Sequence, residues 1–252
     1  MKGRSLDVLL LLILVAARVR IDTLAGLVAP RPVELLARIP VLPASSLRLL
    51  EDWLVDPYSL LLITATFVLV LVYATLDLFG RHLQESRRYR IKLLLIYAIV
   101  FTTVVAQSSL LMALRHLSTP ASFTHDGGVI QTEEAARLLL EGKNPYVEDY
   151  VDTPMAEWGL DLKTALYHFP YLPWTFVSAA PVRAALRDLF GWYDQRLIYV
   201  LLFMVMMWLA PKLTSHPRDR LCLTMVLGLN PIMGSDVIFG QNDSFVLFWL
   251  VL

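Results

Sequence analysis

Asp126 is the residue of this sequence best suited to carry out chemistry. It lies between His125 and the pair Gly127-Gly128, so a ligand can approach its backbone closely. A carboxylate in this position can act as a general base or as a ligand for a divalent metal ion such as Mg²⁺ or Mn²⁺. Its ordinary pKa of about 3.9 makes it a weak base unless burial or nearby acids raise that pKa. The alternative is an aspartate that only caps a turn.

Two basic side chains accompany Asp126 in the polar sequence that follows. Lys143 lies in the same acidic segment, where it can bind a lipid phosphate or stay in water. His168 stands where the chain returns to apolar sequence, beside Tyr171 and Trp174, whose residue types are enriched at membrane interfaces. We expect both to contact substrate, Lys143 through phosphate and His168 through phosphate or a hydroxyl.

A second polar group interrupts the apolar C-terminal part of the chain. Gln241, Asn242 and Asp243 follow Gly240 between two apolar runs. Polar side chains at membrane depth are costly unless they line a cavity or a site. We therefore expect these three residues to bind substrate and to line one cavity with Asp126, on the same side of the membrane.

The elements that must position Asp126 begin with a short helix. Thr132 is a good N-cap, acids follow it where the helix dipole favours them, and Gly142 suits the position just after a helix end. These signals predict a helix over 133–141. Its apolar face, at helical spacing, is suited to lying along a bilayer or packing on the membrane spans.

The composition is typical of a multi-pass membrane protein. Apolar residues make up 57% of the chain and charged residues only 17%, below the quarter expected of a soluble domain. The 22 basic and 22 acidic residues balance, so there is no electrostatic case for nucleic acid as a partner. One cysteine, Cys222, excludes an intrachain disulfide.

Apolar runs predict one all-α, polytopic transmembrane domain over 1–252, embedded in the lipid bilayer of the plasma membrane. The loop before Leu93 carries five basic residues against the single acid Glu85, which places it in the cytoplasm. The loop 116–170, which holds Asp126, then lies outside. The spans that we expect cover 8–29 as a retained anchor, 58–79, 93–115, 171–187, 196–211, 220–236 and 244–252.

The run 171–187 can cross the membrane or dip into it and return. If it crosses, the turn at Gly240 falls in the cytoplasm and the basic residues near Arg218 fall outside, against the charge rule. A dipping segment, broken near Pro173 and Pro181, reverses both placements. We therefore expect the dipping form. The last apolar run is too short to cross a membrane, which predicts that the chain continues beyond Leu252.

The order of these features resembles the polyprenol-phosphate-sugar-dependent glycosyltransferases of the GT-C fold, especially bacterial members. The resemblance covers about half the chain. It rests on Thr124-His125-Asp126, the Gly142-Lys143-Asn144-Pro145-Tyr146 turn, the return at Tyr171-Leu172-Pro173, and Asn230-Pro231 followed by Gly240-Gln241-Asn242-Asp243. The turn after the short helix is its most specific part. One departure is that two apolar segments precede the span that leads to Asp126.

The resemblance implies a GT-C-like helix bundle with an extracytoplasmic active site and a polyprenyl-phosphate-linked sugar as donor. Asp126 would then act as base or metal ligand in an inverting transfer to an extracytoplasmic acceptor. Arg183, with the two basic residues above, would stabilise the departing phosphate. The resemblance adds three expected substrate-binding residues: His125, Asn144 and Tyr146.

Two other classes remain open. A transporter could use a polar path along Asp77, Gln107, Asp236 and Asp243, although these residues lie near segment ends rather than at mid-span. A non-catalytic subunit of a membrane assembly would contact other membrane proteins and would show the same apolar pattern. The loop argues against the transporter, because conduction does not need a large acidic external loop with its own helix. The sequence does not separate a non-catalytic subunit from an enzyme with an unknown substrate.

Overall fold

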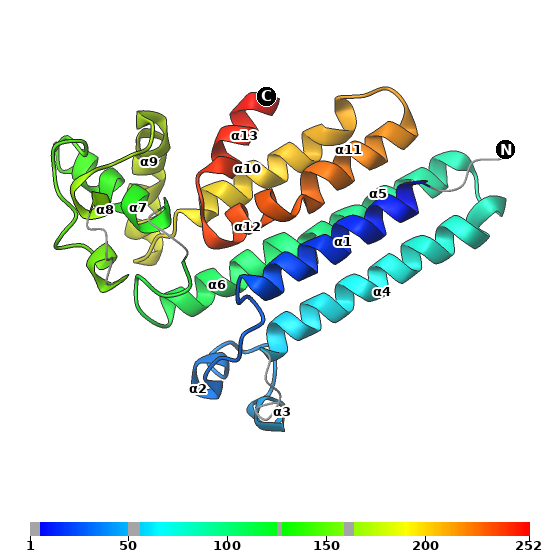
Figure 1. Cartoon of the computed structure of the whole chain (residues 1–252), viewed down its shortest axis with the longest axis horizontal. Coiled ribbons are helices and arrows are strands. Elements are labelled where there is room, and N and C mark those ends of the chain that lie inside the picture. The colour runs from blue at the N-terminus through cyan, green and yellow to red at the C-terminus, as the bar shows by residue number, and fades with distance from the viewer. Residues whose placement is uncertain (1–5, 50–55, 125–127, 159–163) are drawn as a thin grey trace.

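The computed structural model describes residues 6–49, 56–124, 128–158 and 164–252. Throughout these ranges the protein is built from helices and connecting turns, with no strand (Figure 1). The predicted all-α class is therefore confirmed. The helices form two apolar cores, one inside an elongated bundle and one in a smaller unit at an end of that bundle.

Among the residues that the structure describes, two helical rods are long and apolar enough to cross a membrane. The first is α4 (Pro57–Phe79), and the second is the 32-residue rod Glu85–His116. The second rod consists of α5 (Glu85–Val100), a π-helical turn η2 (Phe101–Val105) and α6 (Ala106–His116). Much of α4 is exposed and apolar, as at Leu61, Leu71 and Leu78. A helix face of this kind is suited to contact with lipid.

The π-helical turn adds one residue to a turn of the second rod. The backbone N–H of Ala106 donates to the carbonyl of Phe101, five residues earlier. Thr103 Oγ1 donates to the carbonyl of Ile99 at 2.7 Å, and the hydroxyl oxygens of Thr66 and Thr102 lie 2.7 Å apart. The turn therefore lies where the rod contacts α4.

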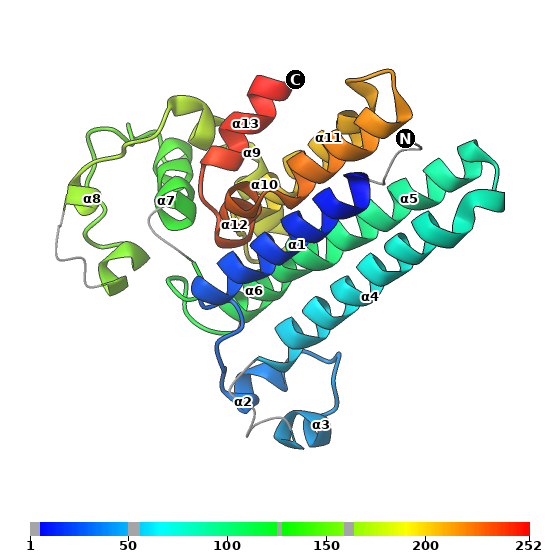
Figure 2. The same cartoon turned by 45° about the vertical axis from the view of Figure 1, so that its right-hand side comes forward.

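The remaining bundle helices pack beside these rods. They are α1 (Leu6–Leu24), α10 (Arg196–Leu209), η4 (Ala210–Lys212), α11 (Pro217–Leu229), α12 (Pro231–Phe239) and α13 (Asp243–Val251). The α11 and α12 helices bend by 46° where they meet, and together they form a third candidate span. Two short helices, α2 (Val33–Leu36) and α3 (Ala44–Leu49), lie beyond α1 (Figure 2).

Arg18, which interrupts the first apolar run of the sequence, is buried inside the bundle. Its Nη2 lies 2.5 Å from Asp22 Oδ1, and its Nη1 donates to the carbonyl of Pro231 at 2.6 Å. Gly234 leaves room for it, because a Cβ there would lie 2.3 Å from Arg18 Nη1. The helix therefore continues through the charged residues because they pair internally.

Lys92 is buried in a second ionic cluster at the other end of α1. Its Nζ donates to Asp7 at 2.6 Å and also contacts Asp77, which accepts from Arg88 at 2.6 Å. The turn η1 (Gly80–His82), the start of α1 and the α10–α11 connection lie at this end of the bundle (Figures 1 and 2). The two basic segments of the sequence, 81–92 and 212–220, therefore share one end.

The smaller unit packs α7 (Gly128–Leu140) against α9 (Pro173–Phe190), with η3 (Pro154–Trp158) and α8 (Thr164–Tyr167) beside them (Figure 1). The predicted start of α7 is wrong by five residues. Thr132 lies inside the helix with its side chain buried, and Glu133 is held by a distant arginine. The ion pair of Glu133 with Arg115 thus outweighs the local N-cap signal at Thr132. Gly142 does follow the helix end with a φ of +76°, as expected.

Of the two breaks predicted in 171–187, the one near Pro173 coincides with the start of a helix, and the one near Pro181 is absent. The α9 helix begins at Pro173 and continues unbroken through Pro181 to Phe190. A proline inside a helix removes one backbone hydrogen bond. Packing against α7 retains the helix here, at the end of the bundle where α6 finishes (Figure 2).

Candidate functional site

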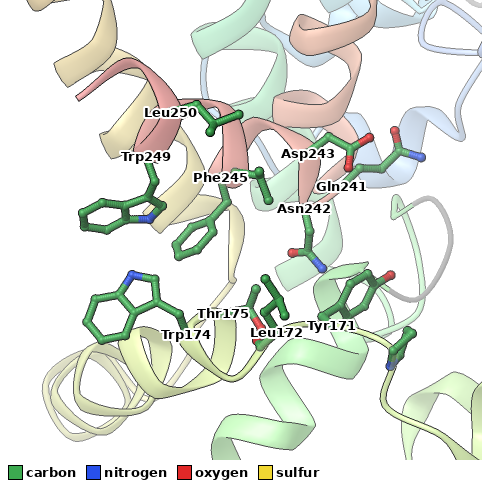
Figure 3. A pocket seen from close by; sticks show the side chains of 12 residues that line it. Tyr171, Leu172, Trp174, Thr175, Gln241, Asn242, Asp243, Phe245, Trp249 and Leu250 are labelled. Carbon is green, nitrogen blue, oxygen red and sulfur yellow. Dashed lines mark hydrogen bonds between the residues drawn. The ribbon is translucent and has the colours of Figure 1, made fainter.

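A cavity of about 510 Å³ lies between the start of α9 and the start of α13 (Figure 3). It joins two segments that are distant in sequence. Its lining residues are Pro170, Tyr171, Leu172, Trp174, Thr175, Gln241, Asn242, Asp243, Phe245, Val246, Trp249 and Leu250. The volume is within the range of pockets that bind small molecules. The structure thus places the predicted residues Gln241, Asn242 and Asp243 around one cavity.

The cavity is polar at one end and aromatic at the other. Asp243 begins α13, and Trp249 and Leu250 follow six and seven residues later, which corresponds to roughly 10 Å along the helix axis. At the aromatic end the rings of Trp174 and Trp249 meet edge to face, with centroids 5.8 Å apart. Leu172 and Leu250 are exposed there. This arrangement suits an amphipathic ligand.

Asn242 supplies the buried polar group of the cavity. Its Oδ1 accepts a hydrogen bond from the hydroxyl of Tyr199, and its Nδ2 has no hydrogen-bond partner among the described residues. Figure 3 shows the amide extending from the start of α13 toward Tyr171 and Leu172. The side chain is 7% exposed. The amide nitrogen is therefore a buried donor that the described residues leave unsatisfied.

A buried ionic cluster connects the smaller unit to the bundle. Arg115, at the end of α6, donates from Nη1 and Nη2 to the two carboxylate oxygens of Glu133 on α7, both at 2.8 Å. Its Nη1 also donates to Asp194 at 2.9 Å. Arg196 pairs with the same aspartate at 2.6 Å. Two arginines and two acids therefore fix α7 relative to α6 and α10.

This cluster was not predicted from the sequence. Glu133 fits the pattern of an ordinary acid in a first helical turn, and no role was expected for Arg115, Asp194 or Arg196. The available signal was the run of charged and amide residues, Asp194-Gln195-Arg196, immediately before an apolar span, since charges in such places are usually paired.

The pKa values of the two acids in the cluster shift in opposite directions. Burial acts to raise the pKa of Asp194, but Arg196 and Arg115 outweigh that effect and hold the pKa at about 2. Burial raises the pKa of Glu133, against the opposing effect of Arg115. Asp194 therefore stabilises the fold at pH values above its ordinary pKa of 3.8. Its contribution is lost as the pH falls toward 2.

Arg196 also links the chain around Asp126 to the cavity. Its Nη1 donates to the carbonyl of Phe123 at 2.8 Å and to that of Ile238 at 3.3 Å. On the other flank, Val129 packs so closely on Gly240 that a Cβ at Gly240 would lie 1.9 Å from Val129 Cγ2. Val129 thus contacts the segment that leads into Gln241 directly, and Phe123 is connected to that segment through Arg196.

The other predicted site residues have different places. His125 and Asp126 lie outside the described residues. Tyr146 supports the lining, because its hydroxyl donates to the carbonyl of Tyr171 at 2.7 Å. Exposed residues outside the cavity lining are Lys143, Asn144 and His168.

Arg183 is buried in the smaller unit, outside the cavity lining. Burial lowers the pKa of its guanidinium, and Arg187 acts in the same direction. Because Arg183 lies outside the lining, it does not supply a cation to the cavity.

The cavity does not offer a complete set of ligands for a divalent metal ion. In the part of the chain that the structure describes, no group of three His, Cys, Asp or Glu side chains could hold one. The lining contributes a single carboxylate, Asp243, and Oδ1 of Asn242 is already used by Tyr199. Mg²⁺ takes near-octahedral oxygen coordination. The described lining therefore does not by itself fit a divalent metal ion.

No protein-family model, curated protein or solved structure matches this chain. The arguments about function therefore come from its own residues.

Proposed function

We propose that the protein is a membrane glycosyltransferase that moves a sugar from a polyprenyl-phosphate donor to an extracytoplasmic acceptor. The observation that supports it best is the cavity, which has amide and carboxylate groups at one end and exposed aromatic and aliphatic side chains at the other. A lipid-linked sugar has the same division. Hydroxyl groups pair with amides and carboxylates, and an isoprenoid chain packs on apolar surface.

In the proposed reaction, an oxygen of the acceptor hydroxyl forms a bond to the anomeric carbon of the sugar. The bond from that carbon to the phosphate oxygen breaks, and polyprenyl phosphate leaves with the electron pair. Asp126 takes the proton of the attacking hydroxyl, and a single displacement inverts the anomeric carbon. The role of Asp126 rests on the sequence. Its support from the structure is indirect, through the contacts of Phe123 and Val129 beside the cavity.

We also propose that the cavity faces the extracytoplasmic side of the plasma membrane in a multi-pass arrangement. The segments 81–92 and 212–220 carry eight basic residues and lie at one end of the bundle, which the positive-inside bias assigns to the cytoplasm. The end of α6 and the turn between α12 and α13 lie at the opposite end (Figure 2). Because α9 packs on α7, the chain need not cross the membrane between them.

Single cysteines should test this sidedness in a Cys222→Ala background. We expect Asp126→Cys and Asp243→Cys to react with an impermeant maleimide in intact cells. Arg87→Cys, at an exposed position of the basic segment, should react only after permeabilisation. The opposite pattern would show that the sidedness is wrong. If position 243 alone required permeabilisation, Asp243 would be removed from the site.

The proposed activity can be measured with purified full-length protein in lipid nanodiscs. The donor is a polyprenyl phosphate carrying a radiolabelled sugar, and the acceptor is a lipid and polymer extract of the source cell envelope. We expect label to move to the acceptor at a rate proportional to the amount of protein. If a panel of hexosyl and pentosyl donors gave no transfer with protein that is folded and correctly inserted, the enzyme proposal would be wrong.

A further inference from the structure

We infer that the cavity binds a neutral sugar ring, with Asn242 Nδ2 donating a hydrogen bond to one of the sugar oxygens. The phosphate of a lipid-linked donor then lies outside the polar end of the cavity, between the sugar and the chain that follows the apolar lining. This inference rests on the proposed function and names the part of the substrate that the cavity recognises.

The orientation of the Asn242 amide is the first observation. The Tyr199 hydroxyl donates to Oδ1, which leaves the Nδ2 side of the amide for a ligand. Tyr199 is itself buried and packs against Phe245, with ring centroids 6.2 Å apart. A buried donor without a partner is destabilising, and a ligand oxygen would remove that cost. The site is therefore arranged in advance for a hydrogen-bond acceptor.

The charge of the cavity lining favours a sugar hydroxyl over a phosphate as the group that accepts from Asn242. The described lining contains one carboxylate, Asp243, and no Lys, Arg or His. A phosphate placed there would meet a like charge with no cation to compensate it. A sugar hydroxyl can instead donate to Asp243 in a charge-assisted hydrogen bond and accept from Asn242. The polar end therefore favours a neutral, hydroxyl-rich group.

The aromatic lining fits the same ligand. Tyr171, Trp174, Phe245 and Trp249 present rings to the cavity. A pyranose ring has flat C–H faces that pack on such rings, while its hydroxyls extend from the edge. A phosphate has no apolar face to contribute. The cavity thus combines contacts to hydroxyls and contacts to C–H groups.

Binding of short amphiphiles that share one chain tests the inference without catalysis. The probes are the hexyl β-glycosides of glucose, mannose and galactose, together with hexyl phosphate and hexanol. Affinities are measured by saturation-transfer difference NMR on nanodiscs prepared without glycosidic detergent, with empty nanodiscs as the blank. We expect at least one glycoside to bind tighter than both hexyl phosphate and hexanol.

Variants connect that preference to the amide. Asn242→Leu should weaken glycoside binding about fivefold, the equivalent of one neutral hydrogen bond, and leave hexanol unaffected. Asn242→Asp, which keeps the shape and replaces the donor with an acceptor, should weaken it at least as much. Tyr199→Phe should have a smaller effect, because it removes only the group that orients the amide. Ser178→Ala, whose hydroxyl bonds within α9, serves as the control.

The outcomes separate the two proposals. Hexyl phosphate binding as tightly as the glycosides, or unchanged glycoside affinity in both folded Asn242 variants, would overturn the inference. Glycoside binding that depends on Asn242, together with no sugar transfer, would overturn the enzyme proposal and support the binding site. Sugar transfer with a KM that Asn242→Asp does not change would support the enzyme proposal and overturn the inferred role of Asn242.

Discussion

Replacing Asp126 with asparagine should lower the rate of sugar transfer by about a hundredfold or more, because a positioned general base contributes roughly 10² to 10⁴ to a rate. The amide has nearly the same shape but cannot take the proton of the acceptor hydroxyl. Membrane insertion and the thermal unfolding midpoint should not change. The measurement is kcat in the nanodisc transfer assay, with insertion checked by cysteine labelling.

Asp149→Asn is the matched control for this prediction. Asp149 is also an aspartate of the external loop, but it is exposed, and its Oδ1 accepts from the backbone N–H of Val151. We expect this variant to retain full activity. If Asp126→Asn kept more than about a tenth of the activity, the loss would be too small for a general base. Loss of activity in the control would make Asp149 the next candidate.

Replacing Arg115 with leucine should destabilise the protein by about 3–5 kcal/mol, the usual cost of removing one partner from a buried ion pair. The change leaves Glu133 buried without its guanidinium, whereas Asp194 keeps Arg196. The loss should appear as a lower thermal unfolding midpoint and as faster proteolysis of the smaller unit. The double variant Arg115→Leu/Glu133→Leu should recover part of it, because no unpaired charge remains.

Arg137→Leu provides the comparison for Arg115. Arg137 pairs with Glu134 on α7 and with Glu141 just after it, and its side chain is 36% exposed, against 7% for Arg115. Surface ion pairs contribute about 0–1 kcal/mol, so the midpoint should change little. Equal effects of the two substitutions would show that the buried cluster does not hold the unit in place.

The helices of the bundle could be predicted from the sequence because each apolar run is long and its surroundings are lipid or other apolar helices. The predicted spans over 58–79 and 93–115 lie within α4 and the α5–α6 rod. The start of α7 could not be predicted in this way. Thr132 and Glu133 match a local N-terminal signal, but Arg115, 18 residues away, gives Glu133 a partner inside the helix instead.

The site could be predicted only in part, for a similar reason. Gln241, Asn242 and Asp243 stood out because polar residues between apolar runs need an explanation. Lys143 and His168 stood out equally by residue type, yet both are exposed. Residue type does not show which way a side chain points. The hydrogen bond from Tyr199 to Asn242 joins residues 43 positions apart, and only the fold brings them together.

The π-helical turn Phe101–Val105 has a consequence for the direction in which Arg115 points. An α-helix advances 100° per residue, so removing one residue from that turn would rotate everything after it by about 100° around the helix axis. Arg115 would then point away from Glu133 and Asp194, and the smaller unit would lose its attachment to the bundle. The turn Phe101–Val105 thus sets the rotation at which Arg115 meets Glu133 and Asp194.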